Sequence, residues 1–496
     1  MDSTRRTPGA LLLASTFRSA WAIAAVLTCA LHAAPAQDPA HDPAQSPTPV
    51  NAPAPQPPSV VKERYLVSKF PDKPSVPPSA SIPLDPLGFV APGAIYMGAR
   101  NALASLDFLD EDHLLFTFRV PGLLHRDASG DEEATERQIR AVILTLPAGA
   151  VSAEAQWTVH DRARYVWPLN DGHFLLRDRK SLLEGDASLT LKPVLDFPGP
   201  LLWLDLDPAQ KFLVTNSREP LAKPAKPGST QDSTQASDPS QPPNQASTQA
   251  SSPAAASSGG APAGAAPNTS MDDDSDAESG DPDLVVRILH RDSGNVLLVS
   301  RARAPVHLPI NSDGYLENLR GRATEWILNL SYFTGGSKML GHVESSCAPT
   351  DDFLSEDEIL VTACGPLGEG KLVAMTTSGR TVWQTQAPAT EIWPQLVVAA
   401  NGLRLAWETL DTDRPINSYA PMGAEDVKEQ SVTVFDAATG DIVLVSPVTP
   451  ILDVGGNVAL SPSGRRVALL NAGAIQIFNL PAPPSLPVQS DKHPAH

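Results

Sequence analysis

The sequence predicts an all-β fold built from repeated antiparallel units, and three observations lead to this prediction. Strand–turn–strand patterns recur every few tens of residues between roughly 96 and 480. Four of these patterns carry a glycine at the turn (Gly149, Gly294, Gly379 and Gly440), where a tight hairpin requires positive φ. Little of the region has the period of an amphipathic helix. Units too thin to fold alone gain stability by stacking, which favours the blades of a β-propeller.

Two kinds of strand pair alternate along the chain. The pairs with a glycine turn span 140–157, 284–300, 371–386 and 431–446. The other pairs have an apolar strand, a polar turn and a second apolar strand. They span 105–118, 165–178, 202–216, 326–341, 351–364, 394–408 and 457–471. Counting the second kind predicts seven four-stranded blades, with six or eight as alternatives because units two and four are weakly marked.

The last unit lacks a fourth strand. It contains the pair 457–471 and a third strand at 474–481, after which the chain becomes proline-rich. Propellers commonly complete the last blade with an N-terminal strand, which leaves no open edge. We therefore predict a ring closed by an N-terminal strand. The candidates are ERYLVSKF (63–70) and GAIYMGAR (93–100), and we favour the second.

The N-terminus has the pattern of an export signal. Arg5, Arg6 and Arg18 precede an apolar run at 20–31, and small residues at 34–36 offer a cleavage site. The pattern predicts a signal peptide over 1–36 and a periplasmic or secreted protein, with retention as an anchor as the alternative. No later segment reaches about 18 unbroken apolar residues, so we expect no other membrane insertion.

Three segments have compositions that cannot bury enough apolar surface to fold. They are a Pro-rich linker (37–92), a polar insertion with an acidic end (221–283) and a C-terminal tail (482–496). The insertion separates two strand patterns of one unit, so we predict a long loop within a blade of a propeller spanning 93–481. Its alternating aspartates resemble a calcium loop, but Ala277 stands where glycine is required. We predict no metal site.

Cysteine usage agrees with export. Cys29 lies in the predicted signal, which leaves Cys347 and Cys364 in the mature chain. A disulfide between them would contribute about 3 kcal/mol by restricting the unfolded chain. The alternative is two free, buried cysteines in one strand pair.

The unit VALSPSGRRVALLNAGAIQIFNL (458–480) resembles the repeats of WD40-like and YncE-like secreted bacterial propellers, in which a Ser-Pro-Ser/Asp-Gly turn is followed by two strands. The segment 204–217 is similar, with Asp207-Pro208 at the turn. The Trp-Asp dipeptide of WD40 repeats is absent. The resemblance implies the architecture of most of residues 96–480 and leaves the ligand open.

A dense cluster of ionisable residues lies between 160 and 179. His160 or His173, near Asp161 or Asp178, could act as a general base at the mouth of the ring. The structural alternative is a solvated loop with charge pairs.

Three tryptophans stand at comparable places near the first strands of their units: Trp167, Trp203 and Trp393. They could stack a flat ligand around the channel, although packing between blades is the commoner use of such residues.

No nucleophile, zinc-protease, phosphate-loop or dinucleotide-binding motif is present, so we expect no cofactor and do not favour an enzyme. The net charge of −19, without a basic stripe, argues against nucleic-acid binding. The sequence predicts an exported, monomeric propeller that binds a protein, peptide or glycan. The alternative is a propeller hydrolase or lyase with carboxylate and histidine groups at the channel mouth.

Overall fold

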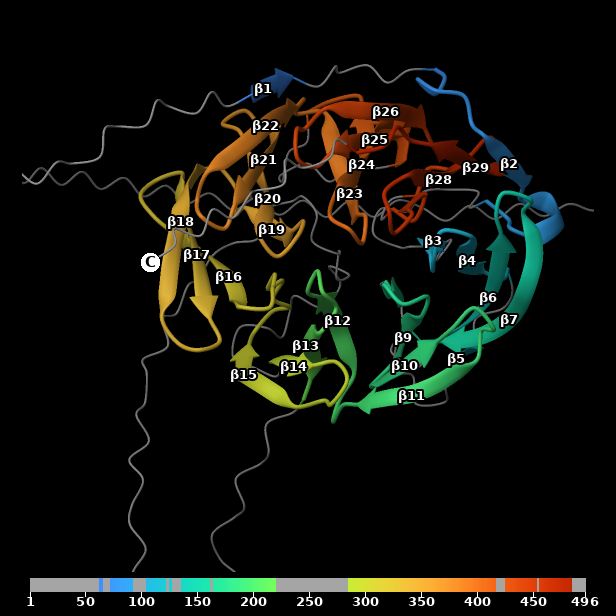
Figure 1. Cartoon of the computed structure of the whole chain (residues 1–496), viewed down its shortest axis with the longest axis horizontal. Helices are drawn as coiled ribbons and strands as arrows, with labels where there is room; N and C mark the ends of the chain where they lie inside the picture. The colour runs from blue at the N-terminus through green and yellow to red at the C-terminus, as the bar shows by residue number, and fades with distance from the viewer. Residues whose placement is uncertain are drawn as a thin grey trace, which may run out of the picture. The chain divides into compact units, whose positions relative to one another are not determined.

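The computed structural model of the chain describes residues 62–65, 72–91, 104–121, 125–126, 135–160, 164–219, 284–415, 424–452 and 455–483. Several predicted segments lie outside these residues: the signal peptide (1–36), the candidate strand 93–100, the insertion (221–283) and residues 484–496 of the tail. The described strands form seven sheets arranged in a ring, which is a seven-bladed β-propeller (Figure 1). The predicted fold class is confirmed.

The strands follow the chain blade by blade. Blade 1 holds β3 (Ser105–Phe108), β4 (His113–Arg119), β6 (Thr135–Thr145) and β7 (Ala150–Val159), with the short β5 (His125–Arg126) beside β6. Blade 2 holds β8 (Val166–Pro168), β9 (Phe174–Asp178), β10 (Ser181–Gly185) and β11 (Leu191–Asp196), and blade 3 holds β12 (Leu201–Leu206), β13 (Phe212–Arg218), β14 (Leu284–His290) and β15 (Val296–Ala302). Blade 4 holds β16 (Gly314–Arg320), β17 (Glu325–Tyr332) and β18 (Ser337–Glu344).

The remaining blades complete the ring. Blade 5 holds β19 (Thr350–Phe353), β20 (Glu358–Cys364), β21 (Gly370–Thr376) and β22 (Thr381–Ala387), and blade 6 holds β23 (Glu391–Val398), β24 (Arg404–Thr412), β25 (Val427–Asp436) and β26 (Ile442–Pro447). Blade 7 holds β27 (Val458–Leu460), β28 (Arg466–Asn471), β29 (Ala474–Asn479) and, from the N-terminal side, β2 (Ala80–Pro83). The only described helices are two 3₁₀ turns, at Asp85–Leu87 and Ala424–Asp426.

The four predicted glycine hairpins join the third and fourth strands of blades 1, 3, 5 and 6. Gly149, Gly294, Gly379 and Gly440 have φ between 65° and 93°. At Gly440 a side chain would also collide with Trp383 of the preceding blade, because an added Cβ would lie 2.6 Å from its ring. Hairpin geometry and close packing between blades therefore both require glycine there.

Blade 4 corrects one strand assignment. The segment 326–341, predicted as a first strand pair, forms the third and fourth strands, β17 and β18. The chain enters the blade earlier, at 306–310. This extended segment makes a single antiparallel bridge, Ile310 with Tyr315, and Leu316 N donates to the carbonyl of Pro309. Pro305 and Pro309 cannot donate to a ladder, which explains why the innermost position holds an irregular segment.

The ring closes through an N-terminal strand, but through neither candidate segment. β2 pairs antiparallel with β29 and completes blade 7. Ile82 of β2 is 6% exposed and packs in the core shared by blades 1 and 7. The choice of segment was wrong because β2 has only four residues, ASIP, with little apolar alternation. These residues also lie inside the segment predicted as a Pro-rich linker.

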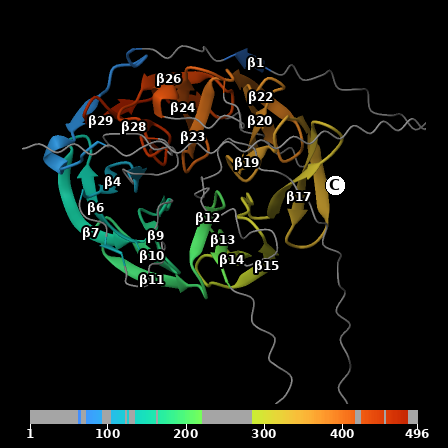
Figure 2. The same cartoon turned by 180° about the vertical axis from the view of Figure 1, so that it is seen from behind.

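The described residues 62–65 and 72–83 also lie along the outer rim of blades 5 to 7. β1 (Lys62–Tyr65) adds to blade 5 as a parallel fifth strand beside β22. Ser75 N donates to the Val445 carbonyl of β26, and β2 follows on blade 7. Figures 1 and 2 show β1 and β2 on the rim from both sides. Three outer edges are thus paired by the same chain.

Apolar packing between blades explains why the units form a ring. Alternate residues of β4 face opposite neighbours: Phe116 packs with Leu470 of blade 7, and Leu115 packs with Phe174 of blade 2. Both β4 residues are 0% exposed. A single blade would leave both faces in water, so each needs a neighbour on either side.

The two ends of the ring differ. The turns between first and second strands meet at one end, which we call the turn face. For example, Asn401 Nδ2 donates to the Ser463 carbonyl between blades 6 and 7, and Ser463 N donates to Glu111 of blade 1. Strand alternation places the start of each innermost strand, and each connection between second and third strands, at the opposite end. We call that end the loop face.

Candidate functional site

A small pocket opens between the innermost strands of blades 2 and 3. Its cavity volume is about 50 Å³. Its lining combines guanidinium groups, indole rings, a carboxylate and aliphatic side chains: Arg164, Trp167, Arg177, Leu202, Trp203, Leu204 and Asp205. Arg164 directly precedes β8, so the pocket lies toward the loop face.

Two arginines hold the indole of Trp167 on the blade 2 side of the pocket. The Cζ atoms of Arg164 and Arg177 lie 5.6 Å and 5.8 Å from the Trp167 ring centroid, within cation–π range. Arg177 is 1% exposed, whereas the Arg164 side chain is 42% exposed. Arg164 Nε donates to the Val166 carbonyl at 2.9 Å, which orients its guanidinium. Arg164 is therefore an oriented cation that a ligand can reach.

Asp205 connects the pocket to blades 4 and 5. On the blade 3 side its Oδ2 accepts a hydrogen bond from Trp203 Nε1 and lies 3.0 Å from His307 Nδ1. His307 stands on the irregular innermost segment of blade 4. Its Nε2 lies 2.8 Å from the Asp351 carbonyl on β19 of blade 5. Both ring nitrogens of His307 face acceptors, so the arrangement suits the doubly protonated imidazolium.

The electrostatics of His307 agree with this geometry. Desolvation by itself lowers the pKa of the imidazole. The charge of Asp205 and the hydrogen bond to it, with further contributions from Asp352 and the Asp351 carbonyl, outweigh desolvation and raise the pKa of His307 to about 10. His307 is therefore a fixed cation near neutral pH.

Two carboxyl groups beside His307 have pKa values raised toward neutral pH. Burial raises the pKa of Asp351 to about 7, although the hydrogen bond from Asn318 and the charge of His307 oppose the shift. Asn318 Nδ2 lies 2.7 Å from Asp351 Oδ2. Burial likewise raises the pKa of Asp352 to about 6, against the charge of His307. Asp205 is the carboxylate in direct contact with the imidazolium, and these two groups tune its surroundings.

The three tryptophans predicted to bind a ligand lie in two different environments. Trp167 and Trp203 both line the pocket. Trp393 is 9% exposed and packs against Trp407 in the core between blades 5 and 6, with ring centroids 5.1 Å apart. Similar positions along the sequence thus have different environments, although Trp203 and Trp393 both lie at an irregularity in their strand pairing.

The structure brings two of the four predicted catalytic residues together, His160 and Asp178. His160 Nδ1 lies 2.7 Å from Asp178 Oδ1, between blades 1 and 2 toward the loop face. His173 lies 3.1 Å from Asp171 in a first turn, on the turn face. Asp161 lies outside the described residues. One histidine–carboxylate pair therefore stands at each end of the ring.

Sequence reasoning missed Arg164, Arg177, Asp205 and His307 as a group. Arg164 and Arg177 lay in the dense ionisable cluster but carried no role, and Asp205 was only a strand residue. One signal could have found His307. In VHLPINSDG (306–314), alternating apolar residues precede an Asn-Ser-Asp-Gly turn, which is the pattern of the other first strand pairs.

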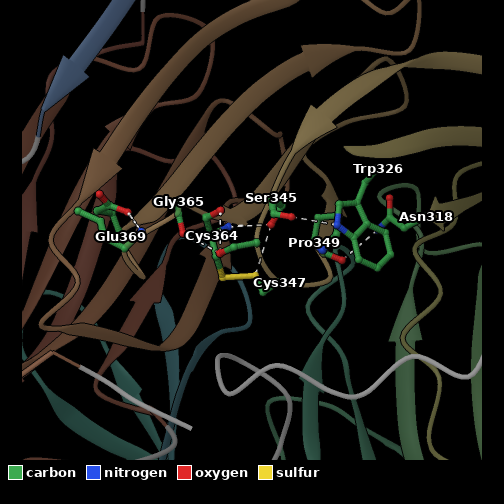
Figure 3. Close-up of a disulfide and its surroundings, with 10 residues drawn as sticks. Asn318, Trp326, Ser345, Cys347, Pro349, Cys364, Gly365 and Glu369 are labelled. Atoms are coloured by element: carbon green, nitrogen blue, oxygen red, sulfur yellow. Dashed lines mark hydrogen bonds between the residues drawn. A yellow bond between two sulfur atoms is a disulfide. The ribbon is translucent and has the colours of Figure 1, made fainter. Parts of the chain in front are cut away.

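A disulfide joins Cys347 and Cys364, as predicted, with their Cα atoms 5.5 Å apart. It links the connection from blade 4 to β20 of blade 5 (Figure 3). Ser345 supports it from the same connection: its Oγ accepts from Cys364 N at 2.9 Å, and its carbonyl accepts from Trp326 Nε1. The disulfide therefore fastens the connection between blades 4 and 5 to the end of β20 on the loop face.

In the described part of the chain, no three histidine, cysteine or carboxylate side chains are grouped so that they could hold a metal ion. The described segments contain no helix with the length and apolarity needed to cross a membrane.

The sheets define the chain as a seven-bladed β-propeller. No protein-family model and no curated protein matches it. Among solved structures, it is similar to acylaminoacyl peptidase from Pyrococcus horikoshii (10% identity, TM-score 0.40, 78% of this chain and 53% of that chain). It is also similar to the β-propeller domain of the Trilobed protease from Pyrococcus furiosus (10%, 0.37, 76% and 93%). A third is Sqt1 from Chaetomium thermophilum, bound to the N-terminus of ribosomal protein L10 (10%, 0.36, 78% and 99%). The chain spans about half the length of the acylaminoacyl peptidase chains that it matches.

Proposed function

We propose that this propeller is an exported binding module that holds a segment of a partner protein or peptide at the loop face. The observation that carries the proposal is the pocket between blades 2 and 3, where Trp167 and Trp203 meet Arg164 and Arg177. Tryptophan and arginine are the residues most enriched at the energetic centres of protein interfaces. No catalytic step is part of the proposal.

The environment of Trp167 favours a peptide over a glycan. A sugar ring binds by stacking on an open aromatic face. Trp167 is only 7% exposed, and both Arg164 and Arg177 lie within 6 Å of its ring centroid. The indole thus serves to orient guanidinium groups, which recognise peptide carbonyl and carboxylate oxygens.

The insertion predicted at 221–283 joins two strands that meet at the loop face. β13 and β14 pair as neighbours in blade 3, so the connection 219–283 begins and ends at this face. Glu219 anchors its start through two contacts with Arg287, Oε1–Nη1 at 2.6 Å and Oε2–Nη2 at 2.7 Å. Trp203 of the pocket, on β12, pairs with Asn216 near the end of β13. We propose that the predicted disordered insertion (221–283) starts and ends at the face that carries the pocket.

Export completes the proposal. The disulfide is compatible with an oxidising compartment. The N-terminal pattern supports a signal peptide over 1–36 and a linker before the propeller, as in the YncE-like secreted propellers that the last unit resembles. We propose a periplasmic or secreted, monomeric protein with a disordered C-terminal tail.

A displayed random-peptide library, selected on the immobilised full chain, tests the function. We expect enriched peptides whose binding is lost in Trp203→Ala. Binding should persist in Arg320→Gln, which changes an arginine that lies 6.0 Å from the Trp326 ring on blade 4, outside the pocket. A pull-down from the exported fraction, with and without residues 221–283, then separates the pocket from the insertion. Failure to enrich any peptide, or enrichment indifferent to Trp203, would refute a peptide-binding pocket.

A further inference from the structure

We infer that Asp351 is a pH-sensitive latch beside the pocket. When its side chain is protonated, β19 stays in contact with blade 4 and the blade 3 side of the pocket is held in place. When the side chain is ionised, this contact loosens. The inference rests on the proposed function, because it adds regulation of the same pocket. It follows from the burial of Asp351, the charges around it and the position of β19.

Asp351 is a buried acid with few hydrogen-bond donors. The residue is 2% exposed. Its Oδ2 accepts from Asn318 Nδ2 of β16 at 2.7 Å, whereas its Oδ1 is buried without a hydrogen-bond partner among the described residues. Its ladder partner on β20 is the uncharged Val361. Burying a carboxylate with so few donors costs more than keeping the proton, so the geometry favours the neutral acid.

The charges around Asp351 do not compensate a second anion. Within the described part of the chain, His307 is the cation whose charge acts on it. The imidazolium is already 3.0 Å from Asp205 Oδ2. Asp352 follows on the same strand, and its charge also opposes ionisation of Asp351. The side chain of Asp352 is 42% exposed, so water can stabilise its charge, and Asp351 is the group that depends on its proton.

The position of β19 allows it to respond. It is the innermost strand of blade 5, and among the described strands it pairs with β20 alone. The Asp351 carbonyl lies 2.8 Å from His307 Nε2, and the contacts continue from His307 through Asp205 to Trp203 of the pocket. An ionised side chain is stabilised by moving toward water. Because the carbonyl belongs to the same residue, that movement lengthens the contact with His307.

The direction of the pH response follows from the sign of the shift. Burial raises the pKa of Asp351 from 3.8 to about 7. The stabilisation by its proton is therefore complete below about pH 4 and is lost as the pH rises through about 7. His307 stays protonated over this range, because its pKa is raised to about 10. The latch holds in weak acid and opens above neutral pH.

Fluorine NMR of the full chain labelled with 5-fluorotryptophan tests the latch without a ligand. The measured quantity is the difference in chemical shift between H₂O and D₂O, which reports how far water reaches each indole. Trp203→Phe and Trp157→Phe assign the pocket signal and a reference in the core between blades 1 and 2. From about pH 5.5 to about pH 8.5 we expect this difference to grow at Trp203, with a midpoint near 7, and to stay constant at Trp157. A constant value at Trp203 overturns the inference, and so does an equal change at both.

Two variants identify the titrating group. Asp351→Asn resembles the protonated acid and keeps an acceptor for Asn318, so the Trp203 value should remain at its acid level throughout. Glu391→Gln is the matched control. Glu391 is 4% exposed on β23 of blade 6, and burial raises its pKa to about 8. This control should leave the Trp203 response unchanged. A response that persists in folded Asp351→Asn, or disappears in folded Glu391→Gln, overturns the inference.

The titration of the parent protein decides the matter by itself if Asp351→Asn does not fold in thermal unfolding. Failure of the proposed function is a separate result, because a library selection without pocket-dependent peptides leaves the fluorine signals as they are. Peptides selected at about pH 5.5 should bind the parent protein more weakly at about pH 8.5 and bind Asp351→Asn equally at both. Equal binding by the parent protein at both values would show that the latch does not regulate the pocket.

Discussion

Asp205 Oδ2 and His307 Nδ1 lie 3.0 Å apart, although 102 positions separate the two residues in the sequence. The contact joins the innermost strand of blade 3 to the irregular innermost segment of blade 4. The other nitrogen of His307 reaches the Asp351 carbonyl on blade 5. One imidazolium therefore links the inner strands of three successive blades next to the pocket.

Replacing His307 by glutamine should destabilise the propeller in a pH-dependent way. The folded-state pKa of His307 is raised from 6.5 to about 10, so its stabilising contribution is complete below about pH 6.5 and is lost as the pH rises toward 10. We expect His307→Gln to cost about 1–2 kcal/mol near neutral pH. The cost is limited because the His307 side chain is partly exposed and because glutamine can keep one of its two hydrogen bonds. Urea unfolding at several pH values measures the difference.

The protonation state of His307 can also be observed directly. Nitrogen NMR of labelled imidazoles should show both ring nitrogens of His307 protonated near pH 8, with the signal assigned by His307→Gln. A neutral His307 at that pH would contradict the clamped imidazolium. Asp205→Asn should move its titration to lower pH.

Glu408→Gln should reduce the pH dependence of stability. Glu408 is 0% exposed, and burial raises its pKa from 4.5 to about 8, although a hydrogen bond with Asn457 opposes the shift. The folded state thus keeps a proton that the unfolded chain releases, and stability falls as the pH rises between these values, by up to about 1.4 kcal/mol per pH unit. Glutamine still accepts the hydrogen bond from Gln430 and does not titrate. We expect the variant to be the more stable protein near pH 8.

Glu219→Gln is a control in which the change in stability should depend on pH in the opposite direction. The hydrogen bonds from Arg287 lower the pKa of Glu219, so its contribution is present above about pH 4.5 and disappears as the pH falls further. This variant should lose stability near neutral pH and approach the parent protein in acid. The same pH response in both variants would argue against the assigned environments. Unfolding free energies across the pH range distinguish the two.

Removing the disulfide should lower stability without changing the fold. Cys347 and Cys364 are 17 positions apart, and on the chain-entropy model the bridge contributes about 3 kcal/mol. The double variant Cys347→Ser, Cys364→Ser should unfold several degrees below the parent protein in calorimetry. Reductant should lower the midpoint of the parent and leave the double variant unaffected. An equal effect of reductant on both proteins would exclude this explanation.

The closing strand β2 should contribute more to the stability of the propeller than β1, which precedes it in the sequence. Ile82 of β2 is buried in the core shared by blades 1 and 7, so Ile82→Ala should cost about 2–4 kcal/mol. Replacing Lys62–Tyr65 by glycines weakens the outer pairing of β1 with β22 and should cost distinctly less. Thermal unfolding compares the two variants. A larger loss from the β1 replacement would mean that the outer rim, and not ring closure, controls stability.

Much of the architecture was predictable because each hairpin is specified locally. Alternating apolar residues and turn glycines marked six of the seven first strand pairs and all four glycine hairpins. Blade 4 was assigned out of register because Pro305 and Pro309 interrupt its innermost segment. The closing strand was misplaced because β2 gains its stability from Ile475 and Ile477 of a distant strand.

The candidate site was less predictable. Trp167 and Trp203 were chosen from the sequence and lie at the pocket, whereas Trp393 was chosen on the same grounds and lies in a core. Arg164, Asp205 and His307 carry no motif. Their contacts depend on how adjacent blades pack against one another, and the spacing of residues within one unit does not predict this packing.

By itself, the sequence predicted the repeated hairpins, the propeller class and a disulfide between Cys347 and Cys364. Turn residues and apolar alternation are local properties, and only these two cysteines remain after the predicted signal. Only the tertiary structure decided which segment closes the ring, which tryptophans reach the pocket and which charges face each other across it. These depend on contacts between blades that are tens to hundreds of residues apart. The same packing sets how far Glu408 and His307 are removed from water, and therefore where they titrate.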